Sequence, residues 1–280
     1  MAYALVAVGY SLVFGILRLI NFAHGSIFAF GSYMVFLFYS LGVPMIPAIL
    51  IALVLSGLLA FGMDKITLEP LRKKNSETIT YLITTVGVSF IIQNTLSVQY
   101  VFTSERQVFP STNVFPPISI GNVTIQSSQL IMFVVALILL VILTLVVNKT
   151  KMGLAMRATE QNSKAAKLMG VNVNRVIAFT FFMGGASAAI AGALYSGYYQ
   201  VVYPTMGYLI GLKAFAAAVV GGIGILYGSV VGGLVVGIGE CLAAQYIGSN
   251  VRDPMAFVIL IVILIIKPNG LFGKKGITKV

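Results

Sequence analysis

Apolar residues occur along this chain in long uninterrupted stretches that are separated by short polar segments. Residues 130–148, LIMFVVALILLVILTLVVN, are apolar around the whole circumference of a helix. A surface helix of a soluble protein instead carries a polar face, and about 20 apolar residues are needed to cross about 30 Å of hydrocarbon. The pattern therefore predicts an all-α polytopic membrane protein that forms one transmembrane domain over residues 1–280.

The apolar stretches predict about eight to nine transmembrane helices, some of them broken at glycine-rich sites. The first stretch has neither a basic n-region nor a suitable cleavage site, so we expect a retained helix and not a signal peptide. The predicted spans are residues 1–19, 26–42, 44–64, 80–102, 129–148, 176–196, 208–226, 229–247 and 254–267.

Basic residues are concentrated in three of the polar segments. Fourteen of the 18 Lys and Arg residues lie in residues 65–77, 149–175 and 267–280. Because Lys and Arg accumulate in cytoplasmic loops, these segments and the C-terminus are predicted to be cytoplasmic. The connections 103–128 and 197–207 contain a single basic residue, Arg106, and are predicted to be external. Nine crossings then place the N-terminus outside.

The composition excludes other classes of protein. A mean hydropathy of +1.00 excludes a soluble domain and requires the lipid bilayer as a partner. The net charge of +11 is explained by the cytoplasmic loops, and no basic helix with interleaved exposed aromatic residues is present. We therefore expect no nucleic-acid partner.

Motifs for catalysis and metal binding are missing from the sequence. A single His excludes an HExxH site, and Cys241, the only cysteine, excludes a disulfide within one chain. No GxSxG motif and no glycine-rich phosphate loop ending in Lys-Ser or Lys-Thr occurs. We predict no cofactor, no metal, no catalytic residue and no ATP hydrolysis by this chain.

The predicted external loop 103–128 contains Pro110, Pro116 and Pro117 between Val, Phe and Ile residues. Proline and the residue before it favour extended backbone, so a non-helical loop is predicted. The loop is either a docking surface or a simple connector.

Polar side chains form a stripe within one apolar stretch. Thr85, Ser89 and Gln93 are spaced four residues apart, which places them on one face of a helix. Polar groups in hydrocarbon turn toward a neighbouring helix or a wet path. The stripe therefore either forms hydrogen bonds between helices or lines a solute pathway.

Two charged residues, Lys213 and Glu240, fall within later apolar stretches. An intramembrane charge costs roughly 2.5 kcal/mol or more and usually finds a partner. The two residues are candidates for an intramembrane ion pair, and the alternative is that Lys213 extends to the outer interface.

Glycines break two of the apolar stretches. Gly224, Gly228 and Gly232 are spaced four apart and permit close helix packing. The tripeptide HGS at 24–26 resembles YGS at 227–229, which indicates an internal duplication, and broken helices in matching positions of two halves are typical of transport sites. The candidate residues of a substrate pathway are Asn21 and His24 at the first break, the stripe Thr85, Ser89 and Gln93, and Gly221, Gly222 and Gly224 at the second break. The alternatives are a structural histidine and tight packing alone.

The basic segment 154–175, LAMRATEQNSKAAKLMGVNVNR, includes a helix-forming run that ends at Gly170. KAAKLMG resembles the EAA-type coupling loop of ABC importer permeases, although Lys164 stands where that motif has Glu and the downstream Leu-Pro is missing. Four motifs in order, NFAHGS (21–26), GLAMRATEQNSKAAKLMGVNV (153–173), AVVGGIGILYGSVVGG (218–233) and KPNGLFG (267–273), resemble the LivH-type permease subunit of branched-chain amino acid ABC importers.

The resemblance implies a multi-pass permease of a bacterial or archaeal cytoplasmic (inner) membrane that moves leucine, isoleucine and valine into the cell. Its implied partners are a second homologous permease subunit, two ATPase subunits and an extracytoplasmic amino-acid-binding protein. The coupling loop, about 149–175, would contact the ATPase through Arg157, Glu160, Ala165, Ala166 and Gly170. The alternatives are a related ABC permease for urea, short amides or another small polar solute, and a stand-alone channel or secondary carrier.

Overall fold

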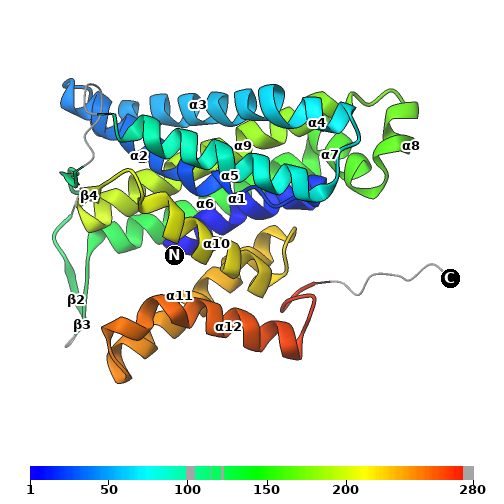
Figure 1. The fold of residues 1–280 in the computed structure, drawn as a ribbon. Helices are drawn as coiled ribbons and strands as arrows, with labels where there is room; N and C mark the ends of the chain where they lie inside the picture. Colours follow the sequence, from blue (N-terminus) through cyan, green and yellow to red (C-terminus); the bar gives the residue numbers. More distant parts are fainter. Residues whose placement is uncertain (99–104, 114, 121–122, 274–280) are drawn as a thin grey trace.

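The computed structural model describes residues 1–98, 105–113, 115–120 and 123–273, which form a helical bundle with two small strand pairs at one end (Figure 1). The helices are α1 (Ala2–Leu17), α2 (Ala23–Ser40), α3 (Met45–Met63), the π-helical turn η1 (Asp64–Leu68), α4 (Glu69–Lys73), α5 (Thr78–Leu96), α6 (Ser127–Lys149), α7 (Lys151–Gln161), α8 (Ser163–Leu168), α9 (Val173–Tyr199), α10 (Met206–Gly221), α11 (Leu226–Tyr246), the 3-10 turn η2 (Ser249–Val251) and α12 (Arg252–Ile266). The strands are β1 (Gln107–Val108), β2 (Ile118–Ile120), β3 (Val123–Ile125) and β4 (Val201–Val202).

The all-α, multi-pass class predicted from the sequence is confirmed. Among the described residues, six helical segments are long and apolar enough to cross a membrane. They are Met45–Lys73, Thr78–Leu96, Ser127–Lys149, Val173–Tyr199, Leu226–Tyr246 and Ser249–Ile266. Helices α1 and α10 are apolar but shorter, and α2 is not among the six. The count of eight to nine crossings therefore stays a prediction.

Several predicted boundaries were wrong. The basic stretch after residue 64, expected to be a loop, continues the helix α3 through η1 and α4 to Lys73. Glu69 lies 2.6 Å from Lys65 Nζ and 3.0 Å from Lys73 Nζ, and such pairs four residues apart stabilise a helix. The predicted span 208–226 ends at Gly221, because Gly222 has a φ of +106° that ends α10. Residues 99–102 of the predicted span 80–102 lie outside the described residues.

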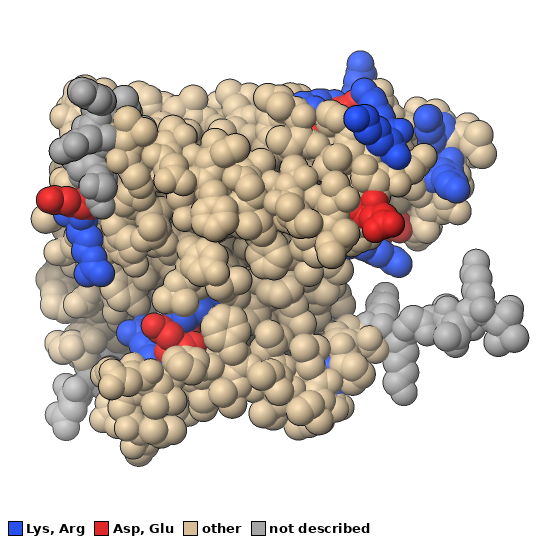
Figure 2. Space-filling model, viewed as in Figure 1, with Lys and Arg blue, Asp and Glu red and all other residues tan. Residues whose placement is uncertain are grey.

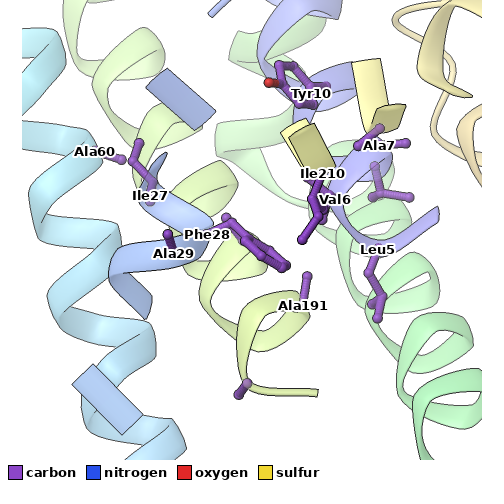
Figure 3. Packing of buried hydrophobic residues seen from close by; sticks show 14 of the residues in the cluster. Leu5, Val6, Ala7, Tyr10, Ile27, Phe28, Ala29, Ala60, Ala191 and Ile210 are labelled. Carbon is purple, nitrogen blue, oxygen red and sulfur yellow. The ribbon is translucent and has the colours of Figure 1, made fainter. Parts of the chain in front are cut away.

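Helix α9 is the centre of the bundle. In its most apolar 18-residue stretch, 78% is buried, and the helix packs against α1, α2 and α3. Its small residues let these neighbours approach closely: a Cβ at Gly185 would lie 2.6 Å from the carbonyl oxygen of Ser56 in α3. Figure 3 shows Phe28 of α2 lying beside Ala191 of α9, with Ile27 directed toward Ala60. Small residues at helix interfaces are how membrane bundles gain van der Waals contact, because lipid offers no hydrophobic driving force between helices.

The two ends of the bundle differ in structure and charge. Helices α4, α7 and α8 lie at one end, and the strands lie at the other (Figure 1). Lys and Arg side chains gather over the end with α4, α7 and α8 (Figure 2). We call these the basic end and the strand end. Two of the three basic segments predicted to share one side, 65–77 and 149–175, therefore share one end of the molecule. In the third, 267–280, residues 274–280 lie outside the described residues.

The described residues of 103–126 form short strands and irregular backbone without a helix, as the prolines predicted, and α6 begins at Ser127. Strand β1 pairs with β4 in antiparallel register, and β2 pairs with β3. The pairing of β1 with β4 ties this loop to the short connection after α9, so the two predicted external connections form one structure.

We expect Gly192→Ala to destabilise the protein strongly. A Cβ there would overlap the carbonyl oxygen of Phe28 and the hydroxyl of Ser32, and overpacking of this kind costs about 1–3 kcal/mol. Gly62→Ala is the matched control, because its Cβ would meet nothing within 4 Å. Thermal unfolding in detergent should show a lower midpoint for Gly192→Ala alone; equal midpoints for the two variants would contradict the close packing of α2 on α9.

Candidate functional site

The polar stripe on α5 faces α2. Ser89 and Ser26 are joined by a hydrogen bond of 2.7 Å between their hydroxyl oxygens, and Gln93 Nε2 donates to Ser26 Oγ at 3.1 Å and to Ser89 Oγ at 3.2 Å. Thr85 Oγ1 accepts from the backbone N–H of Phe22 at 3.4 Å and donates to the carbonyl of Leu82 at 2.9 Å. Of the two roles considered for the stripe, these bonds correspond to hydrogen bonding between helices, in which the stripe holds α5 and α2 together.

The first break, residues 18–22, connects α1 to α2. Asn21 is buried, and its Oδ1 accepts from the backbone N–H of Ala23 at 3.1 Å, so it satisfies a donor at the start of α2. His24 is also buried, and its ring packs edge-to-face on Tyr10 with centroids 4.6 Å apart. The space beside these residues is narrow, apolar and too small for a water molecule. Asn21 and His24 therefore line no open passage in this conformation.

The second break, residues 222–225, connects α10 to α11, and several backbone groups in and beside it have partners. The carbonyls of Val220 and Gly221 accept from the backbone N–H groups of Leu271 (2.9 Å) and Phe272 (3.2 Å). The N–H of Gly224 donates to Ser11 Oγ at 3.3 Å. The sequence predicted free backbone groups at Gly221, Gly222 and Gly224 for a solute, whereas the KPNGLFG segment occupies the Gly221 carbonyl and α1 occupies the Gly224 N–H.

The tripeptides HGS and YGS occupy matching positions, as the second to fourth residues of α2 and α11. Each glycine packs on α10: Gly25 contacts Gly207, and a Cβ at Gly228 would lie 2.6 Å from the carbonyl oxygen of Gly221. Each serine bonds to another helix, Ser26 to α5 and Ser229 to Ser11 of α1. The two breaks are thus built in the same way and share one supporting helix.

Lys213 and Glu240 lie in direct contact near the strand end, within a larger charged cluster. Lys213 Nζ is 2.8 Å from Glu240 Oε1 and 2.6 Å from Asp253 Oδ1, and both Lys213 and Glu240 are buried. Tyr3 OH donates to Glu240 Oε2 at 2.8 Å, while Arg252 Nε stands 3.7 Å from that oxygen. Because an unpaired intramembrane charge is costly, this network explains how α10 and α11 tolerate charges.

Sequence reasoning missed three members of this cluster, Tyr3, Arg252 and Asp253. All three lie at the ends of apolar stretches, where a polar residue normally meets water and needs no special partner. Asp253 is the second residue of α12, which follows the turn at Gly248 and η2, and this turn brings α12 back onto α11.

The basic segment 149–175 forms two helices instead of one. Asn162 ends α7 and caps α8, because its Oδ1 accepts from the N–H groups of Lys164 (3.1 Å) and Ala165 (3.0 Å). Gly170, with a φ of +83°, ends the turn after α8, where the N–H of Val171 donates to the carbonyl of Ala166 at 3.0 Å. Ala166 is buried and Ala165 is exposed.

The tip of this segment projects apolar side chains away from the bundle. Leu168 is 89% exposed and Met169 is 85% exposed. Arg157 is directed to the end of α6, where its Nη1 donates to the carbonyl of Asn148 at 3.2 Å, so it anchors α7 to its own chain. Glu160 is exposed. Leu168 and Met169 were not singled out from the sequence, although two large apolar residues beside lysines in a basic segment are a recognisable signal.

The described part of the chain contains no group of three or more His, Cys, Asp and Glu residues able to hold a metal ion.

A family model described as "Branched-chain amino acid transport system / permease component" matches residues 1–266. The chain belongs to this family. The predicted resemblance to LivH-type permeases is thereby confirmed. Permeases of this family are components of transport systems, so the chain is a transport subunit.

Relatives in this permease family match the chain along almost its whole length. The high-affinity branched-chain amino acid transport system permease protein BraD of Pseudomonas aeruginosa is 35% identical over 99% of this chain and 94% of BraD. The permease protein LivH of Escherichia coli, named for the same transport system, is 34% identical over 99% of this chain and 93% of LivH. The probable branched-chain amino acid transport permease protein LivH of Methanocaldococcus jannaschii is 29% identical over 96% and 88% of the two chains. No solved structure gives a significant match.

We expect Lys213→Met to destabilise this permease by about 3–5 kcal/mol, the usual cost of removing one partner of a buried ion pair. The substitution removes the cation 2.8 Å from Glu240, which is 1% exposed, and leaves Arg252 at 3.7 Å as the cation that opposes its charge. The double variant Lys213→Met with Glu240→Gln should recover much of that stability, because it also removes the Glu240 charge. Denaturation in mixed micelles measures the free energy of unfolding of the single and double variants. If the loss in the double variant equalled the sum of the losses in the two single variants, a direct pair would be contradicted.

Proposed function

We propose that the chain is the permease subunit of an ATP-binding cassette importer that moves leucine, isoleucine and valine into the cell. The observation that carries this proposal is the match over 99% of the chain to BraD and LivH, whose names specify high-affinity branched-chain amino acid transport. The relatives come from bacteria and an archaeon, which supports a bacterial or archaeal cytoplasmic membrane as the proposed location.

The energy source lies on other subunits in this proposal. The chain has no phosphate-binding loop, so two separate ATPase subunits would hydrolyse ATP. Helices α7 and α8 would form their docking site, because this hairpin projects Leu168 and Met169 from the basic end. The basic end and the C-terminus then face the cytoplasm, as the excess of Lys and Arg favours.

The strand end would face outward and receive an extracytoplasmic amino-acid-binding protein. A second homologous permease would complete the translocation path. We infer nine crossings, with α1 and α10 as the shorter members of the two broken pairs. At the basic end, two cavities of about 550 Å³ and 420 Å³ lie on either side of Arg18 and Glu160 and support an exit route beside the breaks. Thr85, Ser89 and Gln93 would shape this route by holding α2 against α5.

The transport reaction is the direct test. Vesicles that contain the complete complex should accumulate radiolabelled leucine only when ATP is present on the cytoplasmic side and the binding protein on the external side. Leucine entry that is equally fast without ATP would support a channel or secondary carrier. Urea or short-amide entry under the same requirements, without leucine entry, would support a related ABC permease.

The coupling role of α8 is tested at Gly170. We expect Gly170→Trp to abolish leucine-stimulated ATP hydrolysis, because a bulky residue is placed on the proposed docking surface, while membrane insertion stays intact. The φ of +83° at this position also strains any L side chain, so Gly170→Asn is the matched control. Asn tolerates left-handed backbone, and the Asn variant should keep at least half of the activity.

Undiminished ATP hydrolysis and uptake in the Gly170→Trp protein would contradict the proposed contact. Equal losses in the Trp and Asn variants would assign the effect to backbone strain at the end of α8 and would likewise count against docking at this residue.

A further inference from the structure

A cavity of about 510 Å³ opens at the strand end between the first residues of α1, the start of α6, the end of α9, the second half of α11 and the start of α12. Its walls are mainly apolar and include Met132, Phe133, Leu234 and Ile238. Small-molecule sites of about 300–1,000 Å³ are typically apolar with a few placed polar groups. The cavity is therefore large enough for an amino acid with an aliphatic side chain.

The polar groups of this cavity are of opposite charge. Glu240 and Arg252 both line it, and tyrosine hydroxyls surround them. Arg252 Nη2 donates to Tyr199 OH at 3.2 Å, whereas the 3.7 Å between Arg252 Nε and Glu240 Oε2 is too long for a hydrogen bond. The arginine and the carboxylate are thus adjacent but not joined by a hydrogen bond. The Arg252 side chain is 42% exposed.

The surrounding network has a balanced charge. Lys213 and Arg252 are opposed by Glu240 and Asp253, all within one connected set of contacts. A zwitterion adds one charge of each sign and leaves the network balanced, whereas an amine or a carboxylate alone would leave one buried charge uncompensated. The chemistry thus discriminates in favour of an α-amino acid over its singly charged analogues.

The ammonium and carboxylate of an amino acid match the arrangement of these groups. A substrate carboxylate can pair with the guanidinium of Arg252, whose planar donors suit bidentate contact. The ammonium can approach Glu240 Oε2 and Tyr3 OH, and the aliphatic side chain can lie against the apolar wall of α6 and α11. The space beside Gly237 is open, because a Cβ there would meet nothing within 4 Å.

We propose that this cavity is the outer binding site at which a zwitterionic aliphatic amino acid enters the permease, with Arg252 and Glu240 holding its two charged groups. This inference rests on the proposed import function and on the strand end facing outward.

The only cysteine of the chain gives a direct test, because Cys241 is exposed and lines the cavity. The complete complex in nanodiscs, without ATP, is treated with a small maleimide, and alkylation of the Cys241 peptide is followed by mass spectrometry. Saturating leucine should slow alkylation at least fivefold. 4-Methylpentanoate, which lacks the ammonium, and isoamylamine, which lacks the carboxylate, should have little effect.

Two variants make the test specific. Arg252→Gln should weaken the protection by leucine at least tenfold, and Arg106→Gln, an arginine at the same end outside the cavity, should leave it unchanged. Gly237→Leu should fill the cavity and prevent protection without lowering the thermal stability, since the added side chain enters open space.

The outcomes separate this inference from the import function. Unchanged alkylation with leucine, in a complex that accumulates leucine with ATP, would overturn the outer site and leave the import function standing. Equal protection by leucine, 4-methylpentanoate and isoamylamine would show a site for apolar molecules only and would also overturn it. A complex that accumulates no leucine would instead contradict the import function.

Discussion

The structure depends on one constraint: inside hydrocarbon, each polar group must find its partner within the protein. A helix satisfies its own backbone, but each of the two helix breaks leaves backbone groups without partners inside a helix. At the second break, the Leu271 and Phe272 amides satisfy the carbonyls at the end of α10, and Ser11 accepts from Gly224. At the first break, Asn21 and Thr85 perform the same role for the start of α2. The breaks exist because other segments of the chain complete them.

The same constraint explains which features could be predicted from the sequence. The polytopic class follows from apolar runs, and the stripe of Thr85, Ser89 and Gln93 follows from helical spacing, because both are local patterns. The contact of Lys213 with Glu240 follows from the cost of an isolated charge in lipid. The roles of Tyr3 and Asp253 in that contact depend on how α1 and α12 pack, and no local pattern encodes such packing. The continuation of α3 through the basic stretch to Lys73 was missed because charge was taken as a loop signal, whereas the i,i+4 ion pairs of Glu69 stabilise a helix.

The stripe also shows why residue type alone does not separate a pathway from a packing interface. Gln93, Ser89 and Ser26 form a closed set of hydrogen bonds between α5 and α2. A solute could bind there only by replacing these bonds. The strand-end cavity differs, since Arg252 and Glu240 are adjacent without a hydrogen bond between them and the space beside them is open. Polar groups that lack a hydrogen bond to each other and border open space suit a binding site. Polar groups that are fully bonded to each other suit a packed interface.

Helix α1 connects the elements that transport would have to move. Its first turn contributes Tyr3 to the charged cluster, and its centre contacts His24 through Gly9 and bonds to Ser229 through Ser11. Gly15, near its end, packs on Gly224 at the second break. The helix therefore touches the outer cluster and both breaks, and it also packs against α7. Since packed helices move as rigid bodies between discrete arrangements, a displacement of α7 in the proposed importer would reach the breaks and the outer cavity through α1, without a separate relay of flexible segments.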